Sequence, residues 1–174
     1  MLYAEAPCQG KTGGPLPARL FCRSNEQKRM GGTMSLPAQA AMNAVEVQSF
    51  LEQVFEQAMH IKVEETAPGF SRCRLPFDTR HLRPGGTISG PSMFQLADCG
   101  LYAMVLGTLG PVALAVTTNL NINFLRKPGP RDMIAESRAL KFGRRLVIGE
   151  VSLYSDGDAE LVAHATGTYS IPPR

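Results

Sequence analysis

The sequence has few of the residues that mark a metal or disulfide protein. Its 174 residues include four cysteines and three histidines. Neither type forms a CxxC pair or a cluster with ligand spacing. We therefore expect no metal site, reduced thiols and a cytoplasmic location. The N-terminal segment lacks the continuous apolar core of a signal peptide.

Long apolar runs and strong charge are also missing. The longest apolar stretch, residues 99–116, is interrupted by Gly107, Gly110 and Pro111, so we expect no membrane span. The formal net charge is only +3, the basic residues are scattered, and 7% of the chain is aromatic. That composition does not indicate nucleic-acid binding. A hydrophobic content of 44% and a mean hydropathy of -0.07 are ordinary for one globular domain with one core.

The first part of the chain differs from the rest in its amino-acid composition. Residues 1–40 are rich in Gly, Pro and polar side chains and show no period, which predicts a disordered leader. Met30, Met34 and Met42 are possible alternative starts within or just after it. The remainder, residues 41–174, is predicted to be the folded domain.

Two helices are predicted from the helical spacing of apolar residues and from residues that are typical of helix ends. The first runs from Asn43, which forms a capping-box pattern with Glu46, to residue 59 or 60. The second covers residues 91–109, where Pro91 suits the first turn and Gly110 ends the helix. This second helix is apolar on nearly every face, which predicts that it is enclosed by other elements.

Strands account for most of the remaining chain. Residues 61–66 and 71–77 are predicted to form a hairpin, followed by a loop over residues 81–86. Alternation in residues 114–125 places Thr117 with Asn119 and Asn121 on a polar face. Two further strands are expected at 133–142 and 146–155, and a last one at 160–171. The order indicates an α+β fold in which a curved antiparallel sheet wraps around one long buried helix.

Asp98 is the first candidate for chemistry. It is the only charged residue between Arg83 and Arg126, and it falls in the helix that is predicted to be buried. An isolated carboxylate in such a segment is costly, and residues of this kind gather at functional sites. The turn at residues 85–91 also places unpaired helix-start amides roughly two helical turns from this carboxylate.

These residues carry a resemblance to a known family. Residues 48–172 resemble the hotdog-fold acyl-CoA thioesterases, in particular the phenylacetate-pathway, PaaI-like group. The resemblance rests on five segments in order: Ser89-Gly90-Pro91, Leu96-Ala97-Asp98, Asn121-Ile122-Asn123-Phe124-Leu125-Arg126, Gly143-Arg144-Arg145-Leu146 and Gly167-Thr168-Tyr169. The family's turn histidine is Ser89 here, its second turn glycine is Pro91, and a polar residue six positions earlier is Arg83.

The resemblance implies roles for four residues. Asp98 would be a general base or a nucleophile, and the Gly90 amide would stabilise the oxyanion. Thr117 would contact the attacking water, and Ser89 would donate a hydrogen bond near the thioester. Structural roles stay open for each: Asp98 as a partner of a core donor, Gly90 as a turn residue, Thr117 as an ordinary strand residue and Ser89 as a helix N-cap.

The resemblance also implies a substrate and an assembly. Candidates for binding coenzyme A are Arg83, Asn119, Arg126, Lys127, Arg144 and Arg145, although for any single basic residue a solvated surface position is the alternative. No metal or redox cofactor is expected, since coenzyme A is part of the substrate. Sheets of this fold pair edge to edge, so we expect a homodimer or tetramer with the active site between subunits.

Two other functions stay open. The first is an acyl-CoA-binding protein without catalysis, which the departures at Ser89 and Pro91 allow. The second is a hotdog hydratase or dehydratase, which would need a catalytic histidine. Only His81 lies near the predicted helix, so this second alternative is the weaker one.

Overall fold

The structure is a computed structural model that describes residues 34–55 and 60–173. Most of the expected leader lies outside these residues. Its described part, residues 34–40, contains no helix or strand but runs along the domain. The Met34 amide donates to the Phe142 carbonyl over 2.8 Å, and just beyond it the Ala41 amide donates to the Gly107 carbonyl over 2.7 Å.

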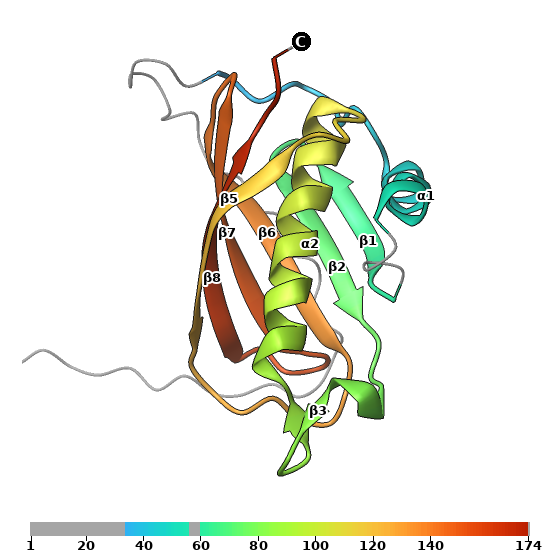
Figure 1. Ribbon diagram of the computed structural model, residues 1–174, viewed down its shortest axis with the longest axis vertical. Helices are drawn as coiled ribbons and strands as arrows, with labels where there is room; N and C mark the ends of the chain where they lie inside the picture. Colours follow the sequence, from blue (N-terminus) through green and yellow to red (C-terminus); the bar gives the residue numbers. More distant parts are fainter. Residues whose placement is uncertain (1–33, 56–59, 174) are drawn as a thin grey trace, which may run out of the picture. The chain divides into compact units, whose positions relative to one another are not determined.

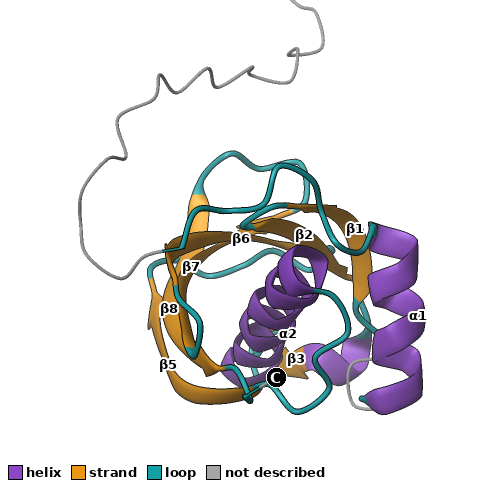
Figure 2. Cartoon of the chain, turned by 90° about the horizontal axis from the view of Figure 1, so that it is seen from above, coloured by secondary structure: helices purple, strands orange, loops and turns teal. Residues whose placement is uncertain are grey.

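A six-stranded antiparallel sheet forms the body of the domain, with strand order β1-β2-β6-β7-β8-β5. The strands are β1 (Lys62–Ala67), β2 (Phe70–Leu75), β5 (Val116–Phe124), β6 (Met133–Phe142), β7 (Leu146–Ser155) and β8 (Leu161–Ser170). The long helix α2 (Gly90–Leu109) lies in front of the sheet (Figure 1). Seen from above, the sheet curves around this helix (Figure 2). The predicted α+β hotdog architecture is therefore confirmed.

Helix α2 is enclosed because the sheet comes very close to it. Thirteen of its 20 residues are buried. The cross-strand pair Gly149 and Gly167 faces Leu101, and a Cβ atom at either glycine would lie 2.7 or 2.5 Å from a Leu101 methyl carbon. Only glycine permits this approach. Across the described residues, no helix combines the length and apolar character needed to span a bilayer.

Helix α1 (Ala44–Val54) covers one edge of the sheet. Its predicted capping box is present, with the Glu46 amide donating to Asn43 Oδ1 over 3.0 Å and the Asn43 amide to Glu46 Oε2 over 2.8 Å. The helix is shorter than predicted, because the backbone of Phe55 has left helical geometry with φ −143° and ψ 73°. The Val63 amide of edge strand β1 donates to Gln48 Oε1 of α1 over 2.8 Å. The opposite edge, β5, has no such cover among the described elements.

The segment predicted as a loop at residues 81–86 is more ordered than expected. A 3-10 helix (Thr79–His81) leads into two short antiparallel strands, β3 (Leu82–Arg83) and β4 (Thr87–Ile88). The intervening turn uses Gly85 and Gly86, whose φ angles are +100° and +74°. Both lie in the left-handed region that glycine adopts without strain, so a tight reversal is possible here.

A bulge corrects the predicted faces of β5. Thr117 pairs with Tyr169, and Asn119 pairs with Thr168, so Thr118 is an extra residue on this strand. An extra residue reverses the alternation of side chains. Thr117 therefore points to the helix side of the sheet, as its buried partner Tyr169 does, while Asn119 points to the outer side. The prediction that Thr117 shares a polar face with Asn119 and Asn121 was wrong.

Candidate active site

Asp98 lies near the middle of α2, half-buried, against the β5 side of the sheet. Its Oδ1 atom accepts two hydrogen bonds, from Thr117 Oγ1 over 2.6 Å and from Tyr169 Oη over 2.8 Å. These two donors are cross-strand partners on β5 and β8. Because the bulge turns Thr117 inward, both hydroxyl groups reach the same carboxylate oxygen.

The groups around Asp98 are held neutral. Burial, followed by the nearby charge of Asp98, raises the pKa of the Tyr169 phenol well above its usual range. Burial likewise raises the pKa of the Cys99 thiol to about 12, again with a contribution from Asp98. Tyr169 therefore acts as a protonated donor. Cys99 and Cys73 are buried free thiols.

Ser89 is the N-cap of α2, one of its two expected roles. Its Oγ accepts from the Ser92 amide over 3.3 Å and lies 2.8 Å from Ser92 Oγ. Ser92 Oγ in turn lies 3.4 Å from His81 Nδ1. Burial and then the neighbouring His60 lower the pKa of His81. A chain of polar side chains thus supports the start of the helix.

Gly90 opens α2, so its amide has no acceptor within the helix and points out of the N-terminal end. A Cβ atom at this position would lie 3.2 Å from Cζ of Phe124. Phe124 is 52% exposed and Gly90 itself is half-buried, so the ring lies beside Gly90 without covering it fully. This is the geometry of an accessible anion-binding helix start.

A groove of about 480 Å³ begins at Gly90. Its lining residues are Arg83, Ile88, Gly90, Met93, Phe124, Leu125, Arg126, Lys127 and Pro128. Apolar side chains form the part next to the helix, and three cationic residues form the rim. Three of the five predicted basic residues therefore come together with the predicted oxyanion donor, although Arg83 is far from Arg126 and Lys127 in sequence.

The three rim cations differ in their partners. Arg126 forms ion pairs with Glu160 and, over 3.7 Å, with Asp158. Arg83 and Lys127 are exposed and form no ion pair with any residue that the structure describes. These two side chains are the ones whose charge is available to a ligand in the groove.

Other predicted binding residues lie elsewhere. Arg144 and Arg145 form the β6–β7 turn, where the Arg145 carbonyl accepts from the Ile171 amide over 2.8 Å. This turn is at the opposite end of β8 from the groove, because the Leu125 and Arg126 amides bind the Val162 carbonyl. Asn119 faces away from Asp98 across the sheet. The structure brings none of these three to the groove, and their roles in binding stay predictions.

Sequence reasoning missed Tyr169 as a partner of Asp98. The Gly167-Thr168-Tyr169 segment was noted only as part of the resemblance, without a role for the tyrosine. The missing information was the register of β5 against β8, which pairs Tyr169 with Thr117. The contact of Ser92 with His81 was missed for a similar reason, since it depends on how the turn before α2 folds.

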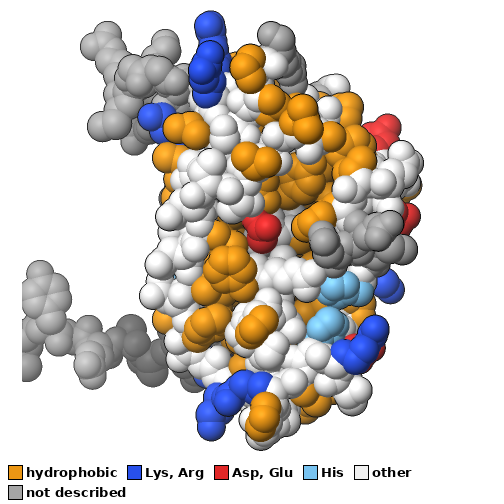
Figure 3. Space-filling model, in the orientation of Figure 1, with side chains coloured by type: hydrophobic (Ala, Val, Ile, Leu, Met, Phe, Trp, Pro, Cys, Tyr) orange, Lys and Arg blue, Asp and Glu red, His pale blue; other side chains and the backbone are white. Residues whose placement is uncertain are grey.

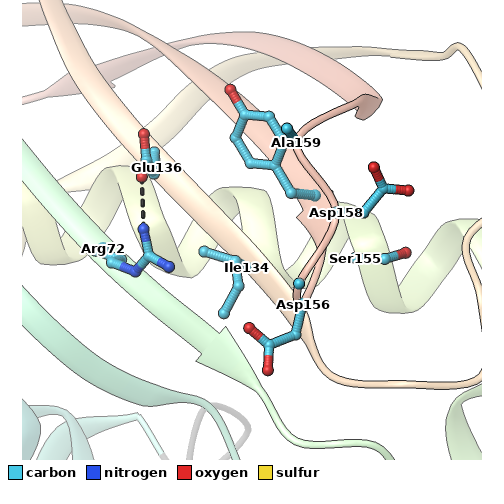
Figure 4. A pocket seen from close by; sticks show the side chains of 9 residues that line it. Arg72, Ile134, Glu136, Ser155, Asp156, Asp158 and Ala159 are labelled. Carbon is cyan, nitrogen blue, oxygen red and sulfur yellow. Dashed lines mark hydrogen bonds and ion pairs between the residues drawn. The ribbon is translucent and has the colours of Figure 1, made fainter. Parts of the chain in front are cut away.

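A second hollow, of about 260 Å³, lies on the outer face of the sheet (Figure 4). Its acidic residues include Glu136, which is held by Arg72 Nη1 over 2.6 Å. No predicted site residue lines this hollow. Among the described residues, no group of three or more His, Cys, Asp or Glu side chains is arranged to hold a metal ion.

Comparison with known proteins agrees with this geometry. The family model of the Thioesterase superfamily matches residues 85–162, which include Gly90, Asp98 and Thr117. A protein of Saccharolobus solfataricus named "Putative esterase" is 37% identical over 123 residues, covering 69% of this chain and 78% of that protein. The residues that the family model matches therefore include most of the candidate site, but not Tyr169.

Solved structures show the same fold. A structure titled as a putative thioesterase from Silicibacter sp. TM1040 has a TM-score of 0.72 and 46% identity, covering 81% of this chain and 96% of that one. The phenylacetic acid degradation protein PaaI from Thermus thermophilus has a TM-score of 0.58 and 26% identity, covering 71% and 99%. The chain belongs to the Thioesterase superfamily.

Proposed function

We propose that this protein hydrolyses an acyl-CoA thioester to the free acid and coenzyme A. The observation that carries the proposal is the carboxylate of Asp98, held by two neutral hydroxyl donors and facing no cation among the described residues. A carboxylate that is positioned but not neutralised can accept a proton. The reaction proposed here uses no metal or redox cofactor.

The proposed reaction begins when Asp98 takes a proton from water. The water oxygen then attacks the thioester carbonyl carbon, and the carbonyl electron pair moves onto oxygen. The Gly90 amide, aided by the helix dipole, stabilises that oxyanion. When the intermediate collapses, the C–S bond breaks and the thiolate takes up the proton that Asp98 received from water, which gives acid and free thiol and restores the carboxylate. Direct attack by Asp98 on the carbonyl remains the alternative route.

The groove beside Gly90 supports coenzyme A as the leaving group. Its apolar side chains suit the uncharged pantetheine arm, and Arg83 and Lys127 on its rim suit phosphates. A chain that lies along this groove would bring its thioester to the helix start. The Gly90 amide and the rim cations would then act on one substrate.

A single chain does not bring its own Gly90 and Asp98 together. Their backbones are separated by eight residues, or about 12 Å along the helix axis. The Gly90 amide also points out of the N-terminal end, away from Asp98. We infer that each active site combines Asp98 of one subunit with Gly90 of another, as in a two-fold dimer.

The surface beside α2 supports this assembly. Phe94 is 41% exposed on a helix that is mostly buried, and Val116, Phe124 and Leu125 are each more than half exposed on or next to β5. Hydrophobic side chains gather over the same face in Figure 3. Because β5 is the uncovered sheet edge, a second copy would bury both the apolar side chains and the open edge. We propose a homodimer, or a tetramer built from such dimers.

The first test is thiol release from short, medium, long and aryl acyl-CoAs, with wild type and Asp98→Asn compared at equal oligomeric state. Hydrolysis by wild type that is lost in the variant is expected. Hydrolysis that survives in the variant would place the base elsewhere. Measurable binding of acyl-CoA without turnover would instead favour a binding protein.

The shared site is tested by mixing two inactive variants. Gly90→Pro removes the amide, and the extended backbone of Ser89, with φ −76° and ψ 152°, is compatible with a following proline. Gly90→Ala is the matched control, since it adds the same contact with Phe124 but keeps the amide.

Refolding Asp98→Asn together with Gly90→Pro should restore about a quarter of wild-type activity, because half of the dimers are mixed and each has one intact site. No recovery, despite mixed dimers detected by mass spectrometry, would place both groups in one chain.

A further inference from the structure

The two oxygen atoms of Asp98 differ in their surroundings. Oδ1 accepts hydrogen bonds from Thr117 Oγ1 over 2.6 Å and from Tyr169 Oη over 2.8 Å. Oδ2 accepts none from the residues that the structure describes. Rotation of the carboxyl group would break both bonds to Oδ1. The two hydroxyl groups therefore hold Oδ1 in place and leave Oδ2 without a hydrogen bond from the described residues.

Tyr169 is itself held rigidly. Its side chain is 4% exposed, and its ring stacks on Tyr102 at a centroid distance of 5.7 Å and an angle of 9°. Tyr102 is anchored in turn, with its hydroxyl group donating to the Val112 carbonyl over 3.3 Å. Tyr169 Oη also lies 3.2 Å from the carbonyl oxygen of Asp98, which ties it to the helix backbone. The position of the phenol is thus set by β8 and α2 together.

We propose that Tyr169 is a positioning residue that, with Thr117, holds Asp98 so that Oδ2 is the oxygen that receives the proton from water. The proposal rests on the thioesterase function above.

The hydrogen bonds to Asp98 come from two strands. Tyr169 donates from β8, and burial raises the pKa of its phenol, so that it stays a protonated donor. Thr117 donates from β5 through its hydroxyl group. Substitutions at these two residues therefore test what holds the carboxylate in place.

The first experiment compares Tyr169→Phe with wild type. The variant keeps the ring and its stacking on Tyr102 but loses the hydroxyl group. We expect kcat to fall about ten- to a hundredfold with little change in KM, as for a lost hydrogen bond to a charged group. The value of kcat/KM should fall by the same factor as kcat, because the hydroxyl group acts on the base and not on substrate binding.

Controls separate positioning from simple damage. Tyr154→Phe removes a phenol from the outer face of the same sheet and should leave kcat and KM unchanged. Thr117→Val should lower kcat with little change in KM, as Tyr169→Phe does. Adding Tyr169→Phe to Asp98→Asn should cause no further loss, because Tyr169 acts through Asp98. A Tyr169→Phe enzyme with wild-type kcat would overturn the proposal.

A second readout does not require turnover. With 3-fluorotyrosine incorporated, the ¹⁹F resonance of position 169, assigned through Tyr169→Phe, should have a different chemical shift in Asp98→Asn and in wild type, because its hydroxyl group donates to the carboxylate. The resonance of position 154 should be the same in both proteins. If wild type hydrolyses no thioester, this measurement still decides the contact. The same chemical shift of position 169 with and without Asp98 would refute it.

Discussion

The carboxylates on the two faces of the sheet have opposite surroundings. On the outer face, Arg72 binds Glu64 and Glu136, and Arg74 binds Glu64, Asp132 and Asp156. Figure 4 shows the pair formed by Arg72 and Glu136. On the helix side, Asp98 accepts only from two hydroxyl groups, and no cation in the described part of the chain pairs with it.

The outer carboxylates form ion pairs that link strands, whereas the carboxylate of Asp98 has no such partner among the described residues and is free to react. The outer pairs link neighbouring strands at partly exposed positions, where each contributes little to stability. Asp98 gains no such neutralisation, so its negative charge remains available for a proton or a developing positive centre. The chemistry of the molecule is therefore expected on the face where the carboxylate stands without a counterion.

The largest expected effect tests this contrast directly. Asp98→Asn should lower kcat/KM about 10²- to 10⁴-fold, the usual contribution of a general base. Glu136→Gln makes the same chemical change in the outer ion-pair network and should leave kcat/KM unaltered. Both rates are measured by thiol release after the melting temperatures have been compared. Equal losses in the two variants would show that the surroundings of a carboxylate do not predict its role here.

The elements were predictable where local signals agree with the final packing. Strands β6 and β7 have the predicted bounds, and α2 begins one residue earlier than predicted. Glycine and proline residues mark the ends of these elements, and the spacing of apolar residues marks their interiors. Asp98 was identifiable because one charge in an apolar helix stands out in any sequence. These features need no knowledge of how distant strands pair.

The site could not be completed from the sequence, because its geometry depends on register. The bulge at Thr118 exists only in the pairing of β5 with β8, and it alone turns Thr117 toward Asp98. Tyr169 becomes a partner of Asp98 through the same register. Likewise, Arg126 and Lys127 resemble each other in sequence, yet the fold pairs Arg126 with acidic residues and leaves Lys127 unpaired in the described chain.

The second prediction extends the contrast to the cations. If only unpaired charge is available to a ligand, Lys127→Gln should raise KM about two- to fivefold without changing kcat, as expected for an exposed charge pair. The increase should shrink at high salt. Arg126→Gln should have a smaller effect because Arg126 is already bound to Glu160, and Arg144→Gln should have none. Equal increases in all three variants would indicate general electrostatic attraction and not a phosphate site in the groove.

The smallest effect concerns stability on the outer face. A hydrogen bond from the Phe77 amide, 2.8 Å long, followed by the Arg74 guanidinium, lowers the pKa of Asp132. A carboxyl group whose pKa is lower in the folded state stabilises the fold above its ordinary pKa, near 3.8, and loses that contribution as the pH falls further. Wild type should therefore exceed Asp132→Asn in melting temperature by about 1 to 3 °C near neutral pH, and this difference should close toward pH 3.

Melting curves from pH 7 to pH 3 measure this difference. As a control, the hydrolytic rate at pH 7 should be unchanged in the variant. A gap that stays constant with pH would mean that Asp132 stabilises the fold through its shape and not through its charge, and the outer carboxylates would then differ less from Asp98 than their ion pairs suggest.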